Sequence, residues 1–219
     1  MVQASASGSG LAASSLAGEQ RELAKQRILR AAGSALAARG LAATVDDVAE
    51  AAGVSRRTIF RHFATRDALF LAVIRAGVRR YGEQLPVPPE ASPDAPVDLR
   101  AWVAELLAVT HRLNARNGRV FWDLVGVRAE DLSPDLAAAA AECRDSRNRF
   151  AATVTEFLWH ARGGPGAPPG WLADAVAVQL SGFTTQSLAG DLDRSPAQVA
   201  AVSARVIEAT LTAALSSLT

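Results

Sequence analysis

Disulfide, metal and catalytic motifs are missing from this sequence. Its single cysteine, Cys143, excludes an internal disulfide, because each bridge needs two thiols. The three histidines, His62, His111 and His160, lie far apart in the sequence and form no pair at metal-ligand spacing. There is no Gly-x-Ser-x-Gly elbow and no Gly-x-x-x-x-Gly-Lys loop. The sequence therefore predicts neither an enzyme nor a protein that binds a metal or another cofactor.

Long apolar runs and a cationic leader are missing as well. No segment reaches the roughly 18 uninterrupted apolar residues expected of a membrane-spanning helix. The first 18 residues contain no Lys or Arg and are rich in Ala, Ser and Gly, which is typical of a flexible tail and not of a secretory signal. We therefore expect a cytoplasmic protein with no membrane segment.

The charge is nearly balanced overall, at a formal +1, but it is unevenly distributed. Residues 19–80 carry a net charge of +6, and residues 81–219 carry −5. A basic module on a mildly acidic body indicates a polyanionic partner near the N-terminus. A solvated basic face on the first helix is the alternative explanation.

Apolar residues at helical spacing are abundant, and no segment of useful length shows the alternation that strands require. The prolines of residues 86–96 exclude a helix there and predict a linker. We expect an all-α fold of about nine helices, in a small N-terminal domain and a larger C-terminal one. The predicted helices cover about 19–39, 44–52, 55–63, 66–81, 98–116, 119–128, 134–162, 171–189 and 196–218.

Two of the short helices are joined by a tight Gly-Val-Ser turn at residues 53–55. This is the sequence pattern of a helix-turn-helix, whose second helix enters the DNA major groove with its N-terminal residues toward the bases. Here that second helix begins with Ser55, Arg56 and Arg57. Arginine can contact guanine with two hydrogen bonds and can also bind phosphates, so the residue types fit this position.

Residues 44–70, TVDDVAEAAGVSRRTIFRHFATRDALF, resemble the DNA-binding domain of the TetR family of bacterial transcriptional regulators. The similar segment covers about residues 20–75. The resemblance implies a helix-turn-helix DNA-binding domain over 19–65, after a tail over 1–18. It further implies a helical regulatory and dimerisation domain over 66–219, with helix 66–82 as the connector. The implied partner is a palindromic double-stranded operator, and the usual role in the family is repression.

The same resemblance assigns contacts to DNA. It places the arginines of the second helix toward the groove, Thr58 and His62 against phosphates, and Arg66 as a further phosphate anchor. Phe60 replaces the family's commoner tyrosine, so a hydroxyl contact is missing there and apolar contact with a thymine methyl group remains. The alternatives to DNA contact are that His62 is a capped histidine on the surface and that Arg61 is simply solvated. The implied DNA-contacting residues are Thr44, Ser55, Arg56, Arg57, Thr58, Phe60, Arg61, His62 and Arg66.

The C-terminal helices carry apolar residues on more than one face, which indicates burial against a partner as well as against the core. By resemblance, the last two helices form a homodimer, and the domain holds a small hydrophobic effector that is neutral or weakly polar. Aromatic residues at helical spacing also fit plain core packing. A helical protein that uses the same fold to bind a protein partner is the alternative function. The candidate pocket residues are Trp102, Leu106, His111, Phe121, Trp122, Phe157, Gln179 and Phe183.

Overall fold

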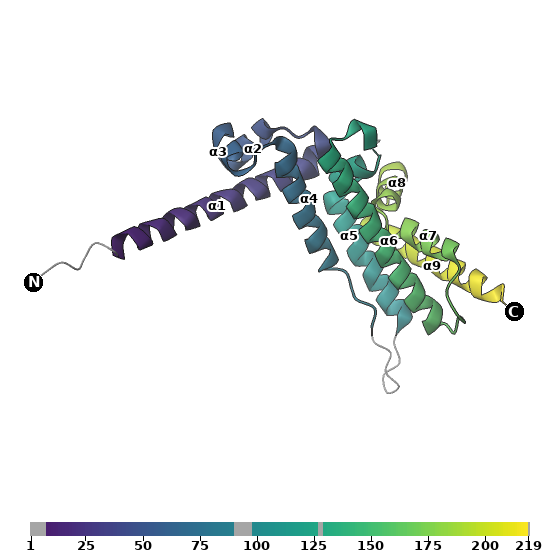
Figure 1. Cartoon of the computed structure of the whole chain (residues 1–219). Coiled ribbons are helices and arrows are strands. Elements are labelled where there is room, and N and C mark those ends of the chain that lie inside the picture. The colour runs from purple at the N-terminus through teal and green to yellow at the C-terminus, as the bar shows by residue number, and fades with distance from the viewer. Residues whose placement is uncertain (1–7, 90–97, 127–128, 219) are drawn as a thin grey trace, which may run out of the picture. The chain divides into compact units, whose positions relative to one another are not determined.

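The computed structural model describes the backbone of residues 8–89, 98–126 and 129–218, and the side chains of 18–89, 98–117 and 130–218. Within these residues the chain is all-α, as predicted, with nine α-helices and two 3-10 helices (Figure 1). The helices are α1 Gly8–Arg39, η1 Gly40–Ala42, α2 Val45–Ala52, α3 Arg56–His62, α4 Arg66–Gly82, α5 Leu99–Gly126, η2 Ala129–Asp131, α6 Pro134–Ala161, α7 Gly170–Gln179, α8 Gly182–Leu192 and α9 Pro196–Ser216.

The chain divides into two compact units, Met1–Ile74 and Arg75–Thr219. The division falls inside α4, whereas the sequence prediction placed the domain boundary after residue 65. The first half of α4 belongs to the N-terminal unit because Leu69, Phe70 and Ile74 are buried there with the apolar faces of α1, α2 and α3. The α4 helix therefore connects the two units along the chain.

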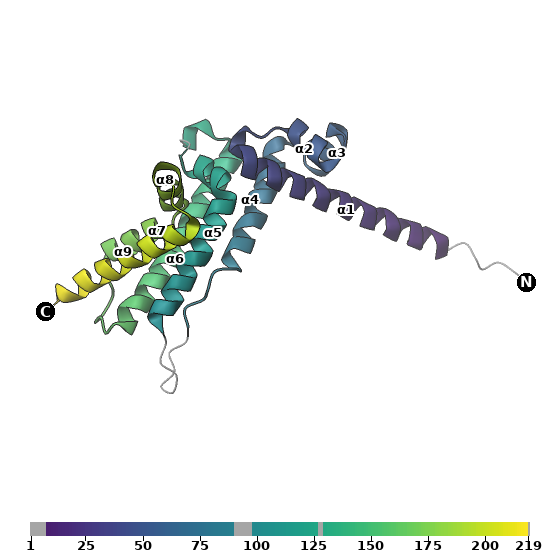
Figure 2. The same ribbon diagram turned by 180° about the vertical axis from the view of Figure 1, so that it is seen from behind.

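The first helix is longer than the sequence predicted. It begins at Gly8, so the prediction of a flexible tail is wrong for residues 8–18, while residues 1–7 lie outside the described part of the chain. Residues 11–17 are mostly Ala, Leu and Ser, and an existing helix extends through such residues without a new nucleation step. Figures 1 and 2 show α1 continuing beyond α2 and α3 within its unit.

Two other helix boundaries differ from the prediction. The helices predicted over 98–116 and 119–128 form one continuous α5, in which the Asn117 amide donates to the Leu113 carbonyl one turn earlier (3.0 Å). The single helix predicted over 171–189 is divided into α7 and α8. The division occurs because the Ser181 hydroxyl caps α8 by accepting from the Thr184 N–H (3.2 Å) and donates to the Val178 carbonyl at the end of α7 (2.7 Å).

The starts of the last long helices agree with the prediction. Pro134 begins α6 and Pro196 begins α9, each directly after a serine. Ser195 forms a capping box with Gln198, which satisfies two backbone N–H groups at the start of α9. Of the predicted linker, residues 86–89 are not helical, and 90–97 lie outside the described residues.

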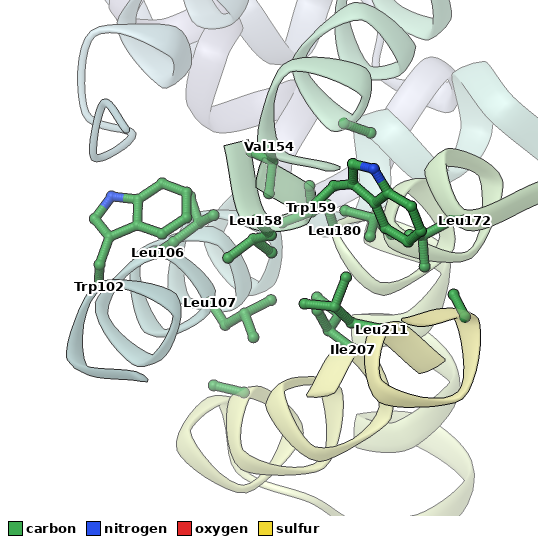
Figure 3. Close-up of a cluster of buried hydrophobic side chains, with 14 residues drawn as sticks. Trp102, Leu106, Leu107, Val154, Leu158, Trp159, Leu172, Leu180, Ile207 and Leu211 are labelled. Carbon is green, nitrogen blue, oxygen red and sulfur yellow. The ribbon is translucent and has the colours of Figure 1, made fainter. Parts of the chain in front are cut away.

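The core of the C-terminal unit gathers side chains from α5, α6, α7 and α9, together with Leu180 between α7 and α8 (Figure 3). Trp159 is nearly fully buried, and its indole N–H donates to the Pro165 carbonyl (3.2 Å). Trp102 packs edge-to-face on Phe157 with ring centroids 5.0 Å apart. This core holds α5 and α6 together, and these two helices also line the candidate cavity described below.

One described helix, α9, is long and apolar enough to cross a membrane by length and composition alone. Its buried residues include Val199, Ile207 and Leu211, which lie in the core of the C-terminal unit. The core helix of a soluble protein passes the same test, so the composition of α9 is weak evidence for a membrane segment.

Candidate functional site

The start of α2 is fixed by a capping box, as the sequence predicted. The Thr44 hydroxyl accepts from the Asp47 N–H (3.2 Å), and the Asp47 carboxylate accepts from the Thr44 N–H (2.8 Å). The Thr44 N–H and hydroxyl both donate to the Asp47 carboxylate (2.8 Å each) and lower its pKa, and Arg39 lowers that pKa further through an ion pair of 2.7 Å. Residues at helix N-termini with free N–H groups suit phosphates, so Thr44 remains a predicted backbone contact.

The turn between α2 and α3 requires glycine at position 53. Gly53 has a φ of 62°, in the left-handed region that residues with a Cβ rarely adopt. The turn is closed by a hydrogen bond from the Val54 N–H to the Ala49 carbonyl (3.0 Å). Ser55 then caps α3 by accepting from the Thr58 N–H (3.2 Å), and the two hydroxyls lie 3.0 Å apart. The hydroxyls of Ser55 and Thr58 thus stabilise the start of α3.

The α3 helix has one buried face and one exposed basic face. Ile59 and Phe63 are buried, as their spacing predicted. Within α3, four of the predicted DNA-contacting residues are exposed: Arg56, Arg57, Phe60 and Arg61. Phe60 is 42% exposed, which is unusual for an aromatic side chain on a helix that has a core available. The exposed face therefore combines three guanidinium groups with one apolar ring.

Arg56 already has an acidic neighbour within the unit. Its guanidinium lies 3.0 Å from the Asp46 carboxylate, and both side chains are more than half exposed. Exposed pairs of this kind contribute little to stability, so a phosphate can replace the carboxylate at low cost. Arg57 and Arg61 have no such acidic neighbour among the described residues.

The surroundings of His62 disfavour the protonated form of its ring. Burial lowers its pKa first, and the charges of Arg61, Arg21 and Lys25 lower the pKa further. Its Nε2 atom is buried and has no hydrogen-bond partner within the described part of the chain. The capped surface histidine that the sequence left open as an alternative is therefore not what the structure shows, and a phosphate contact stays a prediction.

Arg66 differs from its predicted role as a phosphate anchor. Its guanidinium donates to the carbonyls of Leu41 and Ala43, lies 3.3 Å from the Asp67 carboxylate, and stacks 4.4 Å from the centre of the Phe70 ring. The N–H groups of Arg66 that would bind a phosphate thus already donate to backbone carbonyls in and just after η1. The structure assigns Arg66 to holding α4 against the segment that follows α1.

A cavity of about 200 Å³ lies within the C-terminal unit, between the second half of α4 and helices α5, α6 and α8. Its wall is mainly apolar, with hydroxyl, amide and guanidinium groups at a few points. The lining residues are Val78, Tyr81, Gly82, Leu85, Thr110, Asn114, Cys143, Arg144, Ser146, Arg147, Phe150, Leu180, Gly182 and Phe183.

Of the predicted pocket residues whose side chains are described, Phe183 is the one that lines this cavity. Trp102, Leu106 and Phe157 belong to the hydrophobic core, and Gln179 lies at the end of α7 away from the cavity wall. The side chains of Phe121 and Trp122 lie outside the described residues. Aromatic residues at helical spacing fill cores more often than they line pockets, which is the alternative that the sequence left open.

The residues that the sequence analysis missed are polar groups on apolar helix faces. Thr110 and Asn114 lie one helical turn apart on α5 and are both buried. Polar residues at i and i+4 on an otherwise apolar face were the available signal. The cavity wall also contains two arginines, Arg144 and Arg147.

A chain of buried hydrogen bonds runs from the cavity wall to α9. Tyr81 donates to the Asn114 Oδ1 (3.1 Å), and the Asn114 Nδ2 donates to the Thr185 hydroxyl (3.2 Å). His111 lies between the hydroxyls of Thr185 (2.8 Å) and Ser203 (3.1 Å). His111 is fully buried, and burial lowers its pKa to about 4, so the ring is neutral near pH 7. His111 is therefore a connecting residue between helices and not a wall of the cavity.

The capped α2, the glycine turn and the exposed basic α3 define a helix-turn-helix protein. Residues 28–73 match the family model described as bacterial regulatory proteins, tetR family. An uncharacterized HTH-type transcriptional regulator of Mycobacterium tuberculosis is 38% identical over 73 residues, which cover 33% of this chain and 36% of that protein. This chain thus spans about a third of the length of the curated relatives it matches. Residues 28–73 thus resemble the TetR family, and the similar proteins are named as transcriptional regulators, a non-enzymatic role.

Solved structures agree with the fold over most of the chain. A transcriptional regulator from Rhodococcus sp. Rha1 has a TM-score of 0.64 and 20% identity, covering 86% of this chain and 96% of that chain. A tetR-family transcriptional regulator from Streptomyces coelicolor also has a TM-score of 0.64, with 18% identity, and covers 90% of this chain and 84% of that chain. At these identities the likeness shows the fold alone. The similar fold includes the C-terminal unit as well as the helix-turn-helix.

Proposed function

We propose that the protein is a sequence-specific DNA-binding repressor that acts in the cytoplasm. The observation that supports this most directly is the exposed face of α3, where Arg56, Arg57 and Arg61 surround Phe60 on a helix capped at its start. Such a helix fits the major groove, with arginines for guanine edges or phosphates and a phenyl ring for a thymine methyl group.

We propose further that the protein binds its operator as a homodimer through α8 and α9. Four exposed apolar residues follow one stripe of α9 at helical spacing, Val202, Val206, Ala209 and Ala213. This stripe lies beside the buried face that includes Ile207, and no described residue of the chain covers it. Leu192 at the end of α8 is also exposed. A twofold mate would bury the same stripe on both chains.

The cavity of the C-terminal unit is the proposed effector site. A ligand there would contact Tyr81 and Asn114, the first two members of the hydrogen-bonded chain that ends at Ser203 on α9. The α4 helix, which carries Tyr81, leads directly into the N-terminal unit along the chain. An effector that binds one arrangement of these helices more tightly would shift the population of that arrangement and lower operator affinity by its differential affinity.

Selection of genomic DNA fragments by the purified protein tests the DNA-binding proposal. We expect recovered fragments to share a palindromic site, with half-sites about one helical turn or a multiple apart. Arg57→Ala should weaken binding to that site by about 1–3 kcal/mol and relax one base position. Arg149→Ala, an exposed arginine on α6, is the matched control and should bind like the wild type.

The alternative, a helical protein that binds a protein partner through the same fold, predicts another outcome. Recovery of random fragments, with equal affinity of the wild type and Arg57→Ala, would favour it. A loss that is uniform over all sequences would instead assign Arg57 to a phosphate.

A further inference from the structure

The cavity contains positive charge that no acidic side chain of the described residues balances. Arg144 and Arg147 lie three residues apart on α6, and both line the cavity half-buried. The lining includes no Asp or Glu, and neither guanidinium forms an ion pair with a carboxylate in the described part of the chain. Arg147 donates from Nε and Nη2 to the neutral amide of Asn148 (3.2 and 3.1 Å).

This arrangement is unfavourable without an anion. Burial lowers the pKa of Arg147, and the neighbouring Arg144 lowers it further, because two like charges share a partly desolvated site. An arginine stays protonated in spite of such a shift, so the site keeps its charge. Chains usually pair half-buried charges with an acid, and a bound anion would supply that partner here.

Among the neutral polar groups of the wall, Thr110 offers a place for a ligand oxygen. The Asn114 amide is already used, since it donates to Leu180 and Thr185 and accepts from Tyr81. Burial raises the pKa of Tyr81 to about 12, and the nearby Thr110 hydroxyl opposes that rise. Thr110 Oγ1 nevertheless has no hydrogen-bond partner of regular geometry among the described residues. Thr110 is only 1% exposed, so an unpaired hydroxyl here points to a polar ligand atom.

The size and composition of the cavity restrict the rest of the ligand. Its volume of about 200 Å³ lies below the ~300–1,000 Å³ of sites for drug-sized molecules and near the ~150 Å³ of a cavity that holds benzene. The remaining wall is formed by aliphatic and aromatic side chains such as Leu85, Phe150 and Leu180. The body of the ligand is therefore apolar and small, of the order of one ring or a medium-length chain.

We propose that the cavity binds a small monocarboxylate with an apolar body, its carboxylate held by Arg144 and Arg147 and its body by the apolar wall. This assignment rests on one part of the proposed function, namely that the cavity is a ligand site. Arginine binds carboxylates by charge-assisted hydrogen bonds, often two at once, which a neutral ligand of the same shape cannot form.

Binding of matched acids and amides to the full chain tests this assignment by calorimetry. Suitable pairs are phenylacetate with phenylacetamide, phenylbutyrate with phenylbutanamide, and octanoate with octanamide, since each pair keeps its body and differs in charge. We expect at least one acid to bind about tenfold or more tightly than its amide, the difference typical of a charge-assisted hydrogen bond. Arg147→Gln should remove most of that preference, Arg147→Lys should restore part of it, and Arg149→Gln on the exposed side of α6 should leave it unchanged.

Three results would overturn the ligand class. In the first, no acid binds at about 1 mM, the weak end of specific binding. In the second, the amides bind as tightly as the acids, and in the third, Arg147→Gln and Arg144→Gln keep the wild-type preference for acids over amides. Operator affinity, measured separately, distinguishes the two proposals. Arginine-dependent acid binding that leaves operator affinity unchanged supports the ligand class and contradicts effector release. Release of DNA by amides and not by acids supports effector release and contradicts the ligand class.

Discussion

The buried histidine of the C-terminal unit should make the protein acid-sensitive in a defined pH range. His111 is fully buried between Thr185 and Ser203, and burial lowers its pKa from 6.5 to about 4. In the unfolded chain the histidine returns to its ordinary pKa. The unfolded state therefore binds one more proton than the folded state between these two values, and stability falls as the pH is lowered through this range.

The size of this effect follows from the two pKa values. For a folded-state pKa of about 4 and an unfolded value of 6.5, the linkage relation gives a loss of about 2 kcal/mol in the free energy of unfolding between pH 7 and pH 5. Little of the loss occurs above pH 7, since both states are then neutral at this position. Below pH 4 the loss stops increasing, because both states are protonated.

Denaturant unfolding followed by circular dichroism at pH 7, 6 and 5 measures this loss. Carboxylates and other histidines also titrate, so the informative quantity is the difference in pH dependence between the wild type and His111→Gln, whose side chain is neutral throughout. We expect the wild type to lose about 2 kcal/mol more than His111→Gln from pH 7 to pH 5. His160→Gln, which changes an exposed histidine of α6, should retain the wild-type dependence. Parallel curves for the wild type and His111→Gln would refute the reasoning.

Three further perturbations have defined outcomes. Lowering the pH from 8 to 6 should tighten DNA binding by up to about tenfold per pH unit, because a phosphate beside His62 favours its protonated form. DNA binding by His62→Gln should depend less on pH. Equal pH dependence of the wild type and His62→Gln would exclude the contact. Val206→Asp should convert the dimer to a monomer in light scattering, whereas Thr212→Asp, outside the exposed stripe, should not; a dimer in both would place the interface elsewhere. Gly164→Ala should cost about 1–3 kcal/mol in thermal or denaturant unfolding, because its Cβ would lie 2.3 Å from the Trp159 ring, while Gly170→Ala, with open space around it, serves as the control.

Features that depend on local sequence could be predicted. The helix starts at or beside Thr44, Ser55 and Ser195 could be predicted because a capping residue and the N–H it accepts from are only two or three positions apart. The left-handed turn at Gly53 was predicted for the same reason. These local rules position the exposed arginines of α3, so the candidate DNA-binding face could be derived before its geometry was known.

Features that depend on distant residues could not be predicted. Arg66 was expected at a phosphate, but its donors reach carbonyls 23 and 25 positions earlier in the chain. The cavity combines residues from 78 to 183, and no pattern within one helix indicates that their side chains leave a space between them. The division between α7 and α8 was missed because Ser181 lies within an apolar segment and forms its capping bonds only when the helix is already interrupted.

The salt dependence of DNA binding tests the central proposal most directly. The affinity for the site recovered from genomic DNA, and for a scrambled duplex of equal length, would be measured by fluorescence anisotropy over a range of salt concentrations. If α3 reads DNA, the affinity for the recovered site should fall steeply and linearly with the logarithm of salt concentration, with several phosphate contacts per dimer, and should exceed the affinity for the scrambled duplex at every salt concentration. A shallow slope together with equal affinity for both duplexes would contradict the account.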